Sequence, residues 1–576
     1  MDKLVIHFKH HLLGQDPLVF ENAIEFVVAK DVSEVKNAIK QIESYSKQGY
    51  YAVGYISYEA AKAFNNEMEV HENVKLPYVY FGIYENKVVY EHKTNPSTIE
   101  LDFLPNTSRG LYDKAINKIH QAIEQGLTKQ VNYTIRLIAK YENINLDNYY
   151  QQLSHAQQAN FTAHLQFPEF AILSISPELF FAWDGEIIET RPMKGTIQRG
   201  RHVAEDIHNK EQLINSSKDK NENKMIVNLM KEELLKIATP ETITISKLFD
   251  IETYPTVYQM TSTLKAKTKE NTTLLSIFES LFPCASVTGS PKISTMRLIK
   301  KLETSAREVY CGAIGIVTPD NKAIFNVPIR TLWFDHIEKK ATYGVGGGIT
   351  SASSSVAEYQ EIIAKSKVLK YKAPQFELLE TMKLENGHIF LLDYHLKRIK
   401  KSAHFFNFKY DERLVFQKMN ELKRKNKLGI YRLRLRIGKN GTVKIDLHEL
   451  NLTSQIEIVT LAKQPINKKS PYYYHKTTYR HMYEMFKIEG YDDTLLWNED
   501  GYVTEFINGN VVYQINDQKF TPPVDDGLLA GTFRKFLLEN GQLTEKSLHK
   551  DELNQVEKLW LINSVREWVE VNLKNN

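Results

Sequence analysis

The length of the chain, 576 residues, is the feature that most constrains its fold. A single hydrophobic core stops growing near about 250–300 residues, so at least two domains are expected. Hydrophobic residues make up 42% of the chain and charged residues 25%, proportions typical of soluble globular proteins. No apolar run approaches the ~20 residues that a bilayer span requires, and the N-terminal sequence lacks the apolar stretch of a signal peptide. A membrane protein is therefore not expected.

The cysteine and charge content indicates in which cellular compartment the chain works and whether it binds nucleic acid. Only Cys284 and Cys311 occur in the chain, which excludes a disulfide framework and any four-cysteine metal site and favours a reducing cytoplasm. The 74 Lys and Arg residues against 70 Asp and Glu residues give a net charge of +4. A charge this small gives no general reason to bind nucleic acid. The basic run 423–427 is interpreted as a solvated helix end.

A boundary between two domains is predicted near residues 370–375, where a long helix ends against a proline. Before it, short β-rich runs and amphipathic helices alternate without a clear break. Beyond it, an Asn-Gly turn joins two β-rich runs into a predicted hairpin over residues 376–392. The sequence therefore predicts an α+β chain in which a large first domain, residues 1–370, is followed by a smaller second domain, residues 375–576.

Three glutamates of the first domain fall in positions that suit a metal. Glu222 shares the apolar face of a predicted helix over residues 221–236, where a buried carboxylate is usually paired, protonated or bound to a cation. A favourable position at a helix N-terminus explains Glu222 equally well. Glu358 and Glu361 lie three positions apart on another predicted helix, after the glycine-rich run 344–348. Carboxylates beside such a loop suit Mg2+.

Five further motifs stand in order in the same part of the chain. They are Ser-Pro-Glu-Leu-Phe at 176–180, Arg-Pro-Met-Lys-Gly-Thr at 191–196, Ser-Val-Thr-Gly-Ser-Pro-Lys at 286–292, Tyr-Cys-Gly-Ala-Ile-Gly at 310–315 and Ile-Arg-Thr at 329–331. Together with the three glutamates, they resemble the chorismate-utilising enzymes, which include the anthranilate, isochorismate, salicylate and aminodeoxychorismate synthases. The resemblance covers about residues 110–368 and implies a fold of the β-sandwich type with chorismate as the substrate.

The resemblance assigns roles to individual side chains. It makes Glu222 and Glu361 ligands of Mg2+, with Glu358 beside them. It makes Glu178 the general acid that assists loss of the ring hydroxyl. It also implies that Arg330 binds a carboxylate of chorismate, a role that suits the two-pronged guanidinium. Further substrate contacts are implied for Gln130, Thr288, Tyr310, Gly346 and Lys365.

The residue type at position 194 distinguishes two branches of the family. Anthranilate synthases carry alanine in this turn, whereas aminodeoxychorismate synthases carry lysine, as this chain does. A lysine amine with a lowered pKa can add covalently to the ring as the hydroxyl leaves, and ammonia then displaces it to give 4-amino-4-deoxychorismate. For a lysine taken singly, an ordinary surface position in a turn is the more frequent explanation. Gln130 stands where the isochorismate and salicylate branches carry a lysine base, so activation of water is not expected.

A second set of motifs lies beyond the predicted boundary. His-Lys-Thr-Thr-Tyr-Arg at 475–480 is followed by Glu505 and by Gly-Leu-Leu-Ala-Gly-Thr-Phe-Arg at 527–534, with His-Leu-Lys-Arg upstream at 395–398. Over residues 376–571 these resemble the fold-type IV pyridoxal-phosphate enzymes, a family of lyases and aminotransferases. By this resemblance Lys476 binds the aldehyde of the cofactor and Glu505 keeps its ring nitrogen protonated. The remaining implied cofactor contacts are Arg398, Asn510, Gly531 and Thr532.

The two resemblances together imply a bifunctional enzyme that makes 4-aminobenzoate for folate biosynthesis. The first domain would aminate chorismate with Mg2+, and the second would eliminate pyruvate with pyridoxal 5'-phosphate. Two alternatives stay open for the second domain: an aminotransferase for branched-chain or D-amino acids, and a scaffold without activity. No glutaminase-like Gly-x-Cys-x-Gly turn occurs, so a separate glutamine amidotransferase subunit is expected to supply ammonia. The family further suggests a homodimer through the second domain.

Overall fold

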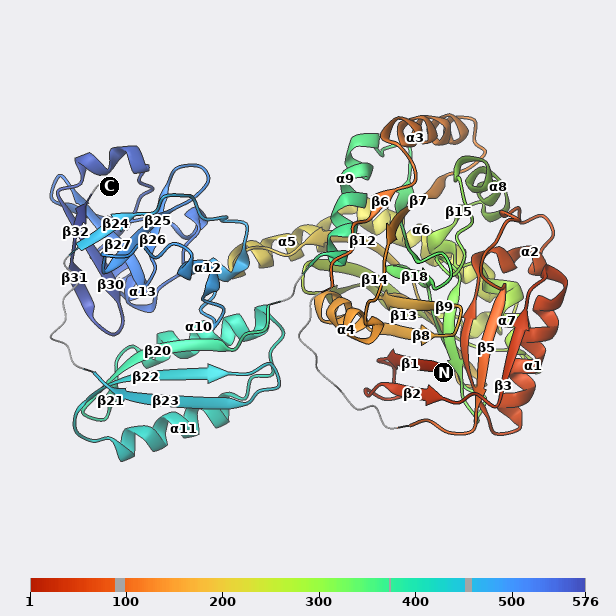
Figure 1. Ribbon diagram of the computed structural model, residues 1–576, viewed down its shortest axis with the longest axis horizontal. Coiled ribbons are helices and arrows are strands. Elements are labelled where there is room, and N and C mark those ends of the chain that lie inside the picture. Colours follow the sequence, from red (N-terminus) through yellow and green to blue (C-terminus); the bar gives the residue numbers. More distant parts are fainter. Residues whose placement is uncertain (1, 89–98, 372–373, 451–457, 575–576) are drawn as a thin grey trace. The chain divides into compact units, whose positions relative to one another are not determined.

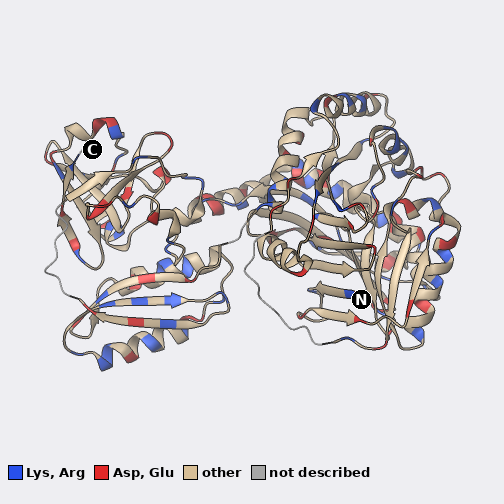
Figure 2. Cartoon of the chain, viewed as in Figure 1, with Lys and Arg blue, Asp and Glu red and all other residues tan. Residues whose placement is uncertain are grey.

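The computed structural model describes residues 2–88, 99–371, 374–450 and 458–574 (Figure 1). The chain divides into two compact units. Unit 1 contains residues 1–198 and 210–373, and unit 2 contains residues 199–209 and 374–576. No helix in the described part of the chain is both long and apolar enough to cross a membrane. In Figure 2 basic and acidic residues are interspersed in both units, in keeping with the small net charge.

Unit 1 is built on two antiparallel sheets. The described strands of the first sheet are β1 (Lys3–Phe8), β2 (Leu18–Glu21), β6 (Leu104–Pro105), β7 (Gln130–Lys140), β8 (Phe161–Gln166), β9 (Phe170–Ser176), β15 (Gly289–Ser290), β18 (Thr331–Asp335) and β19 (Lys340–Ile349). Their spatial order is β15-β7-β19-β18-β9-β8-β1-β2, with β6 beside β7. Strands β7 and β19 pair along almost their whole length, from Lys140 opposite Lys340 to Val131 opposite Ile349.

The second sheet of unit 1 carries the lysine turn. Its described strands are β3 (Glu25–Ala29), β4 (Tyr51–Ile56), β5 (Val79–Tyr84), β10 (Leu179–Trp183), β11 (Ile187–Arg191), β12 (Met193–Gln198), β13 (Thr244–Thr253), β14 (Val257–Lys267), β16 (Ala313–Val317) and β17 (Ala323–Asn326). Their order is β12-β14-β11-β10-β17-β16-β4-β5-β3, with β13 beside β14. Strand β14 therefore pairs with both arms of the turn between β11 and β12.

The two sheets pack face to face and helices cover their outer faces. One apolar cluster joins β1 and β8 of the first sheet to β4 and β16 of the second, which is the packing of a β-sandwich. Helices α3 (Arg109–Glu124), α4 (Leu146–Gln157) and α9 (Ser355–Ser366) pack on the first sheet, and α1 (Val35–Lys47), α6 (Ser217–Leu234) and α7 (Leu274–Leu281) pack on the second. Helix α8 (Lys292–Leu302) and the single turn α2 (Ala61–Phe64) complete the unit.

Serine side chains fix where the helices that reach the site begin. Ser216 accepts a hydrogen bond from the Asp219 amide at the start of α6, and Ser354 accepts one from the Ala357 amide at the start of α9. Such caps satisfy backbone amides that the helix itself leaves unpaired. Helix α6 begins at Ser217, four residues before the predicted start, so Glu222 lies in its second turn.

Unit 2 has two subdomains, the first of which is a sheet with two helices. Its strands are β20 (Leu378–Glu385), β21 (His388–Ile389), β22 (Ile430–Ile437) and β23 (Val443–Glu449), in the order β21-β20-β22-β23. Helices α10 (Leu392–Phe405) and α11 (Glu412–Lys425) cover one face of it through alternating apolar residues of β20 and β22. The predicted hairpin is thus present as β20 and β21, and the basic run 423–427 lies at the end of α11.

The second subdomain of unit 2 is a larger mixed sheet. Its described strands are β24 (Ile458–Leu461), β25 (Asp493–Trp497), β26 (Val503–Phe506), β27 (Gly509–Ile515), β28 (Gln518–Thr521), β29 (Thr544–Glu545), β30 (Lys558–Asn563), β31 (Glu567–Glu570) and β32 (Asn572–Lys574). Parallel pairs, such as β24 with β25, occur beside antiparallel ones. Helix α13 (Thr532–Glu539) packs on β30, and the short helix α12 (His481–Glu484) follows the lysine motif. The predicted α+β fold class is confirmed in both units.

Residues 199–209 correct the predicted division of the chain. They belong to unit 2, although the sequence places them inside the first domain. The Arg199 guanidinium binds Asp206, donates to the Phe405 carbonyl at 3.0 Å and lies 4.6 Å from the centre of the Phe405 ring. His202 lies 2.8 Å from Asp525. The contacts of Arg199 with Phe405 and of His202 with Asp525 span 206 and 323 residues of sequence, and no local pattern predicts them.

Candidate active sites

Lys194 occupies the turn between β11 and β12, and two neighbours hold that turn in place. Gln259 of β14 donates to the Gly195 carbonyl at 2.9 Å and accepts a hydrogen bond from the Thr196 hydroxyl at 2.8 Å. Asn223 of α6 donates to the Lys194 carbonyl at 3.4 Å. Neither Gln259 nor Asn223 was predicted as a site residue. Both act on the backbone of the turn, so they position the lysine and leave its amine to other contacts.

Carboxylates surround the Lys194 amine. Burial lowers the pKa of this amine, and Lys365 acts in the same direction, while Glu222, Glu178 and Glu361 oppose the shift. The three glutamates come from different elements, namely α6, the start of β10 and α9. The fold therefore brings together, around one amine, four of the charged residues that the motifs predicted separately.

Glycines of β19 let these side chains approach the backbone. A Cβ at Gly348 would lie 2.2 Å from Gln130 Nε2 and 2.9 Å from Lys194 Nζ, closer than real Cβ contacts allow. A Cβ at Gly347 would lie 3.2 Å from Glu358 Oε2 and 3.6 Å from Glu361 Oε1. Gly348 therefore allows Lys194 and Gln130 to approach the backbone of β19. The predicted role of Gly346 is a contact with substrate, and it stays a prediction.

Glu358, Glu361 and Lys365 form a charged face on α9. Lys365 Nζ lies 2.6 Å from Glu361 Oε1 and donates to the Gly346 carbonyl at 2.8 Å. Although burial opposes it, Lys365 holds the pKa of Glu361 below its ordinary value. Burial raises the pKa of Glu358, and the charge of Glu361 adds to that effect. Two adjacent carboxylates of which one resists ionisation fit a cation, because a divalent ion would stabilise both negative charges.

Glu178 is a buried carboxyl with one free oxygen. It is 3% exposed, and among the described residues its Oε1 has no hydrogen-bond partner. Burial raises its pKa to about 7, against the effects of Ser286 and Lys194. A carboxyl group with a pKa near neutrality can hold a proton and release it at physiological pH. Ser286, which lies in a predicted motif, was not predicted to touch this acid.

The other predicted substrate residues differ in how free their polar groups are. Gln130 is buried at the start of β7, and its Oε1 has no hydrogen-bond partner among the described residues. Arg330 has a positive φ of 54° and donates to Gln157 at 2.7 Å. The Thr288 hydroxyl donates to the Cys284 carbonyl at 3.2 Å, so it serves the loop before α8. The Tyr310 ring packs against Gly344, where a Cβ would lie 2.3 Å away.

In unit 2, Lys476 lies beside a buried glutamate and two guanidinium groups. Burial lowers the pKa of Lys476 to about 8, and Arg398 and Arg480 add to this, while Glu380 and Glu505 oppose it. The Lys476 carbonyl accepts a hydrogen bond from the Leu379 amide at 3.0 Å, which ties the lysine segment to β20. An amine with a pKa of about 8 is half in the unprotonated, nucleophilic form at pH 8.

Both oxygens of Glu505 are hydrogen-bonded. The Tyr483 hydroxyl donates to Oε1 at 2.9 Å, and Asn510 donates to Oε2 at 3.3 Å. The Arg480 guanidinium lies 4.2 Å from the centre of the Tyr483 ring. Burial raises the pKa of Glu505 to about 7, so this carboxylate favours a positive partner, which a protonated pyridine ring provides. Tyr483 and Arg480 were not predicted as site residues.

The predicted phosphate-binding residues meet at the start of α13. Arg398 donates to the Ala530 carbonyl at 3.2 Å, and the Thr532 hydroxyl lies 3.3 Å from His395 Nε2. A Cβ at Gly531 would lie 1.9 Å from Asn510 Oδ1. The backbone amides of Gly531 and Thr532 stand at a helix N-terminus with a guanidinium beside it, an arrangement that fits a phosphate group.

Glu380, which was not predicted as a site residue, contacts two of the side chains that lie near the start of α13. It accepts two hydrogen bonds from Arg398, at 2.8 and 2.6 Å, and lies 2.6 Å from His395 Nδ1. Although burial alone would raise its pKa, Arg398 and His395 hold the pKa of Glu380 at about 2. The residue precedes Arg398 by 18 positions on another element. A glutamate within a hydrophobic strand was the one available signal.

Comparison with known proteins assigns both parts of the chain. Residues 95–371 match the family model described as chorismate binding enzyme, and residues 377–573 match the model described as amino-transferase class IV. Aminodeoxychorismate synthase component 1 of Escherichia coli (strain K12) is 30% identical over 347 residues, covering 55% of this chain and 76% of that protein. The protein of the same name from Klebsiella aerogenes is 30% identical over 343 residues, covering 54% and 75%.

Unit 1 has the fold of a solved structure as well. The structure of anthranilate synthase component I from Streptococcus pneumoniae TIGR4 matches with a TM-score of 0.54 and 20% identity, over 64% of this chain and 92% of that chain. At this level of identity the likeness shows the fold. Both resemblances predicted from the motifs are confirmed by the family models, each over the part of the chain from which it was drawn.

Proposed function

Because the chain belongs to the chorismate binding enzymes and continues into a class IV aminotransferase domain, we propose that it makes 4-aminobenzoate from chorismate. Unit 1 would exchange the ring hydroxyl of chorismate for an amino group, giving 4-amino-4-deoxychorismate. Unit 2 would then release pyruvate from this intermediate. The product is a building block of folate, so the chain would serve folate biosynthesis.

The observation that carries the proposal is the Lys194 amine among carboxylates. An amine freed by burial, within reach of Glu178, Glu222 and Glu361, is a nucleophile beside a proton donor. The amine would attack the ring as the hydroxyl leaves, and Glu178 would give that hydroxyl its proton so that it departs as water. Ammonia would then displace the lysine. Gln130, with its free oxygen, would lie in reach of the departing group without acting as a base.

The glutamates of α6 and α9 would hold a metal ion. Glu222, Glu358 and Glu361 are the residues we assign to Mg2+, which would neutralise a carboxylate of chorismate when bound. Arg330 would hold the other carboxylate by exchanging its contact with Gln157 for the substrate. Lys365 would keep Glu361 ionised and oriented.

The second step would use the side chains of unit 2 in fixed roles. Pyridoxal phosphate, when bound, would withdraw electrons from the carbon that carries the amino group. Lys476 would bind the cofactor and then remove the ring proton whose loss makes the ring aromatic. Glu505 would sit opposite the ring nitrogen, held by Tyr483 and Asn510. Arg398 and the start of α13 would hold the phosphate.

An aminotransferase acting on branched-chain or D-amino acids is the alternative for unit 2, because the class IV family model does not separate lyases from aminotransferases. The adjoining chorismate-binding unit favours the lyase, since its product carries both the amine and the enolpyruvyl group that a lyase needs. Ammonia would come from a separate glutamine amidotransferase subunit. A homodimer through unit 2 completes the proposal.

Product analysis tests both steps at once. The purified chain is incubated with chorismate, Mg2+, excess ammonium and pyridoxal phosphate, and products are separated by chromatography. We expect 4-aminobenzoate and pyruvate in equal amounts. Lys476→Ala should stop the reaction at aminodeoxychorismate, whereas Lys463→Ala, an exposed lysine of the same unit, should behave as wild type.

Three outcomes would contradict parts of the proposal. Anthranilate or salicylate as the product would refute the role of Lys194. Aminodeoxychorismate that accumulates with the wild-type chain would refute the lyase. Amino-group exchange with branched-chain or D-amino acids in its place would assign unit 2 to the aminotransferases.

A further inference from the structure

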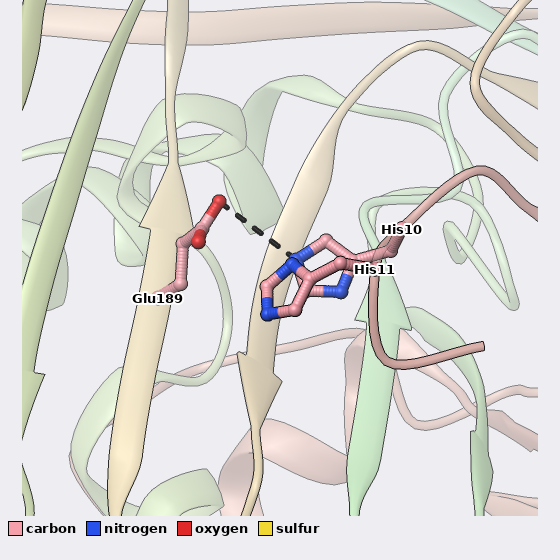
Figure 3. Close-up of side chains that lie close together, drawn as sticks. All are labelled: His10, His11 and Glu189. Carbon is pink, nitrogen blue, oxygen red and sulfur yellow. Dashed lines mark ion pairs between the residues drawn. The ribbon is translucent and has the colours of Figure 1, made fainter. Parts of the chain in front are cut away.

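Two adjacent histidines and a glutamate meet in unit 1 outside the residues assigned above to chorismate. His10 and His11 follow β1, and Glu189 lies on β11. One possible ligand atom from each of the three lies within 4.8 Å of the other two. Figure 3 shows the Glu189 carboxylate directed toward the two imidazole rings, whose centres are 4.2 Å apart. Segments about 180 residues apart in sequence thus place three metal-binding side chains together.

His10 Nε2 points into this cluster without a hydrogen bond. The side chain is 8% exposed, and among the described residues Nε2 has no hydrogen-bond partner. Its nearest charged atom is Glu189 Oε1 at 3.8 Å, beyond hydrogen-bond distance. A buried nitrogen without a partner is unfavourable in the free protein. An ion between His10 and Glu189 would give this nitrogen the partner that the fold withholds.

The backbone holds both sides of the cluster before any ion arrives. The His10 carbonyl accepts hydrogen bonds from the Leu13 and Gly14 amides at 3.0 and 2.9 Å, and the His10 amide donates to the Phe8 carbonyl at 2.8 Å. On the other side, β11 pairs with both β10 and β14. Ligands fixed in this way lose little conformational freedom on binding.

The charges around Glu189 leave one of its oxygens available. Lys265 Nζ lies 2.9 Å from Oε2, so Oε1 faces the histidines. Hydrogen-bonded carboxylate ligands of this kind are usual around metals.

We propose that His10, His11 and Glu189 bind one divalent transition-metal ion of the Zn2+ class. Two imidazoles and a carboxylate suit such an ion, with water as the fourth ligand, whereas Mg2+ prefers oxygen ligands throughout. Tetrahedral coordination needs ligand atoms about 3.3 Å apart, so the side chains close in by rotation. The Leu12 amide, 3.4 Å from His10 Nδ1, gives up this long contact, because Nδ1 carries the proton once Nε2 binds the ion.

The ion would link the N-terminal turn to the strand that leads into the lysine turn. Glu189 precedes Lys194 by five positions on the same β11–β12 segment. The proposal does not depend on the reaction proposed above, because the three ligands are separate from the residues assigned to chorismate, Mg2+ and pyridoxal phosphate.

Zn2+ binding to the full chain tests the site. The untagged protein is stripped with a chelator, loaded with saturating Mg2+ to occupy the glutamates of α6 and α9, and titrated with Zn2+ by calorimetry. Co2+ serves as a second probe, since its visible absorption reports tetrahedral coordination. The variants are His11→Ala, an exposed residue, and Glu189→Gln, and the control is His388→Ala, an exposed histidine of unit 2.

The expected result is one Zn2+ site whose affinity falls by about 100-fold in His11→Ala and in Glu189→Gln and is unchanged in His388→Ala. Wild-type affinity in His11→Ala, or no Zn2+ bound by the wild-type chain, overturns the proposal. Should Glu189→Gln lose its fold, judged by circular dichroism, the exposed His11 variant decides by itself.

Discussion

The two lysines proposed to act in catalysis, Lys194 in unit 1 and Lys476 in unit 2, have different charged surroundings. Burial lowers the pKa of both. Three glutamates near Lys194 oppose the lowering of its pKa, and Lys365 adds to it. The guanidinium groups of Arg398 and Arg480 add to the lowering of the Lys476 pKa. Burial therefore lowers the pKa of both lysines, and the neighbouring charges differ: three glutamates and a lysine near Lys194, two guanidinium groups and two glutamates near Lys476.

The acid beside each lysine sharpens this contrast. Glu178 and Glu505 are both buried, with pKa values raised to about 7. Within the described part of the chain, one oxygen of Glu178 has no hydrogen-bond partner, whereas both oxygens of Glu505 are hydrogen-bonded. A carboxyl with a free oxygen can pass its proton to a substrate. One with both oxygens hydrogen-bonded is held in a fixed orientation.

Removing the amine of unit 1 should have the largest effect. Lys194→Ala is expected to lower the rate of aminodeoxychorismate formation on the order of 10^4-fold, because the covalent route is lost. Conversion of supplied aminodeoxychorismate by unit 2 should remain, as should folding. Lys236→Ala, an exposed lysine of the same unit, is the control. Equal loss of both activities in Lys194→Ala would mean that the lysines do not serve separate reactions.

The proton-donor role of Glu178 predicts the next largest effect. Glu178→Gln should slow the first reaction about 10^3-fold, within the range of general acid catalysis. In the wild-type chain, a group with a pKa of about 7 is protonated below pH 7, so kcat/KM for chorismate should fall as pH rises above about 7. A pH profile measured from acid to alkaline buffers checks both statements. A Glu178→Gln variant that keeps the falling limb would contradict the assignment.

Removing one hydrogen bond to Glu505, the buried acid of unit 2, should have a smaller effect. Tyr483→Phe removes one of the two hydrogen bonds that hold Glu505, at a cost of about 1.4 kcal/mol, or about tenfold in affinity for pyridoxal phosphate. An absorbance titration with the cofactor measures this. Tyr502→Phe, a partly exposed residue of the same unit, should leave the affinity unchanged, and equal affinities in both variants would remove Tyr483 from the site.

The smallest expected effect is on stability. The pKa of Glu178 in the folded chain is above its ordinary 4.5, so the folded state loses stability as pH rises from about 4.5 to 7. Glu178→Gln should therefore stabilise unit 1 by about 1–2 kcal/mol at pH 8 and have little effect at pH 4. Glu505→Gln should stabilise unit 2 by a similar amount, because the pKa of Glu505 is raised to the same value. Denaturant unfolding of the cofactor-free chain at both pH values measures the two effects.

Motifs far apart in sequence predicted charged residues that the fold brings close together. Lys194, Glu178, Glu222 and Glu361 come from four motifs, and the fold gathers them around one amine. The α+β class followed from alternating short strands and helices. What a single motif contains is visible in sequence, because the residues are close along the chain and their types report the chemistry they perform.

Residues that act through other residues were not predictable. Gln259 fixes the lysine turn across 64 positions of sequence, and Glu380 fixes Arg398 from another element. Thr288 was predicted to bind substrate, and its hydroxyl donates a hydrogen bond to the Cys284 carbonyl. Hydrophobic periodicity carries no information on such contacts, because it reports which face is buried and not which polar atoms meet there.

The segment 199–209 limits how the chain can be divided and recombined. A fragment that begins after the proline of residues 370–375 would lack Arg199, whose guanidinium covers the Phe405 ring. That ring lies 4.3 Å from the ring of His475, the residue before Lys476. Such a fragment would expose apolar surface behind Lys476. In evolution, therefore, a duplication or transfer that begins at the visible linker would deliver an incomplete second unit, and the two units would tend to be inherited together.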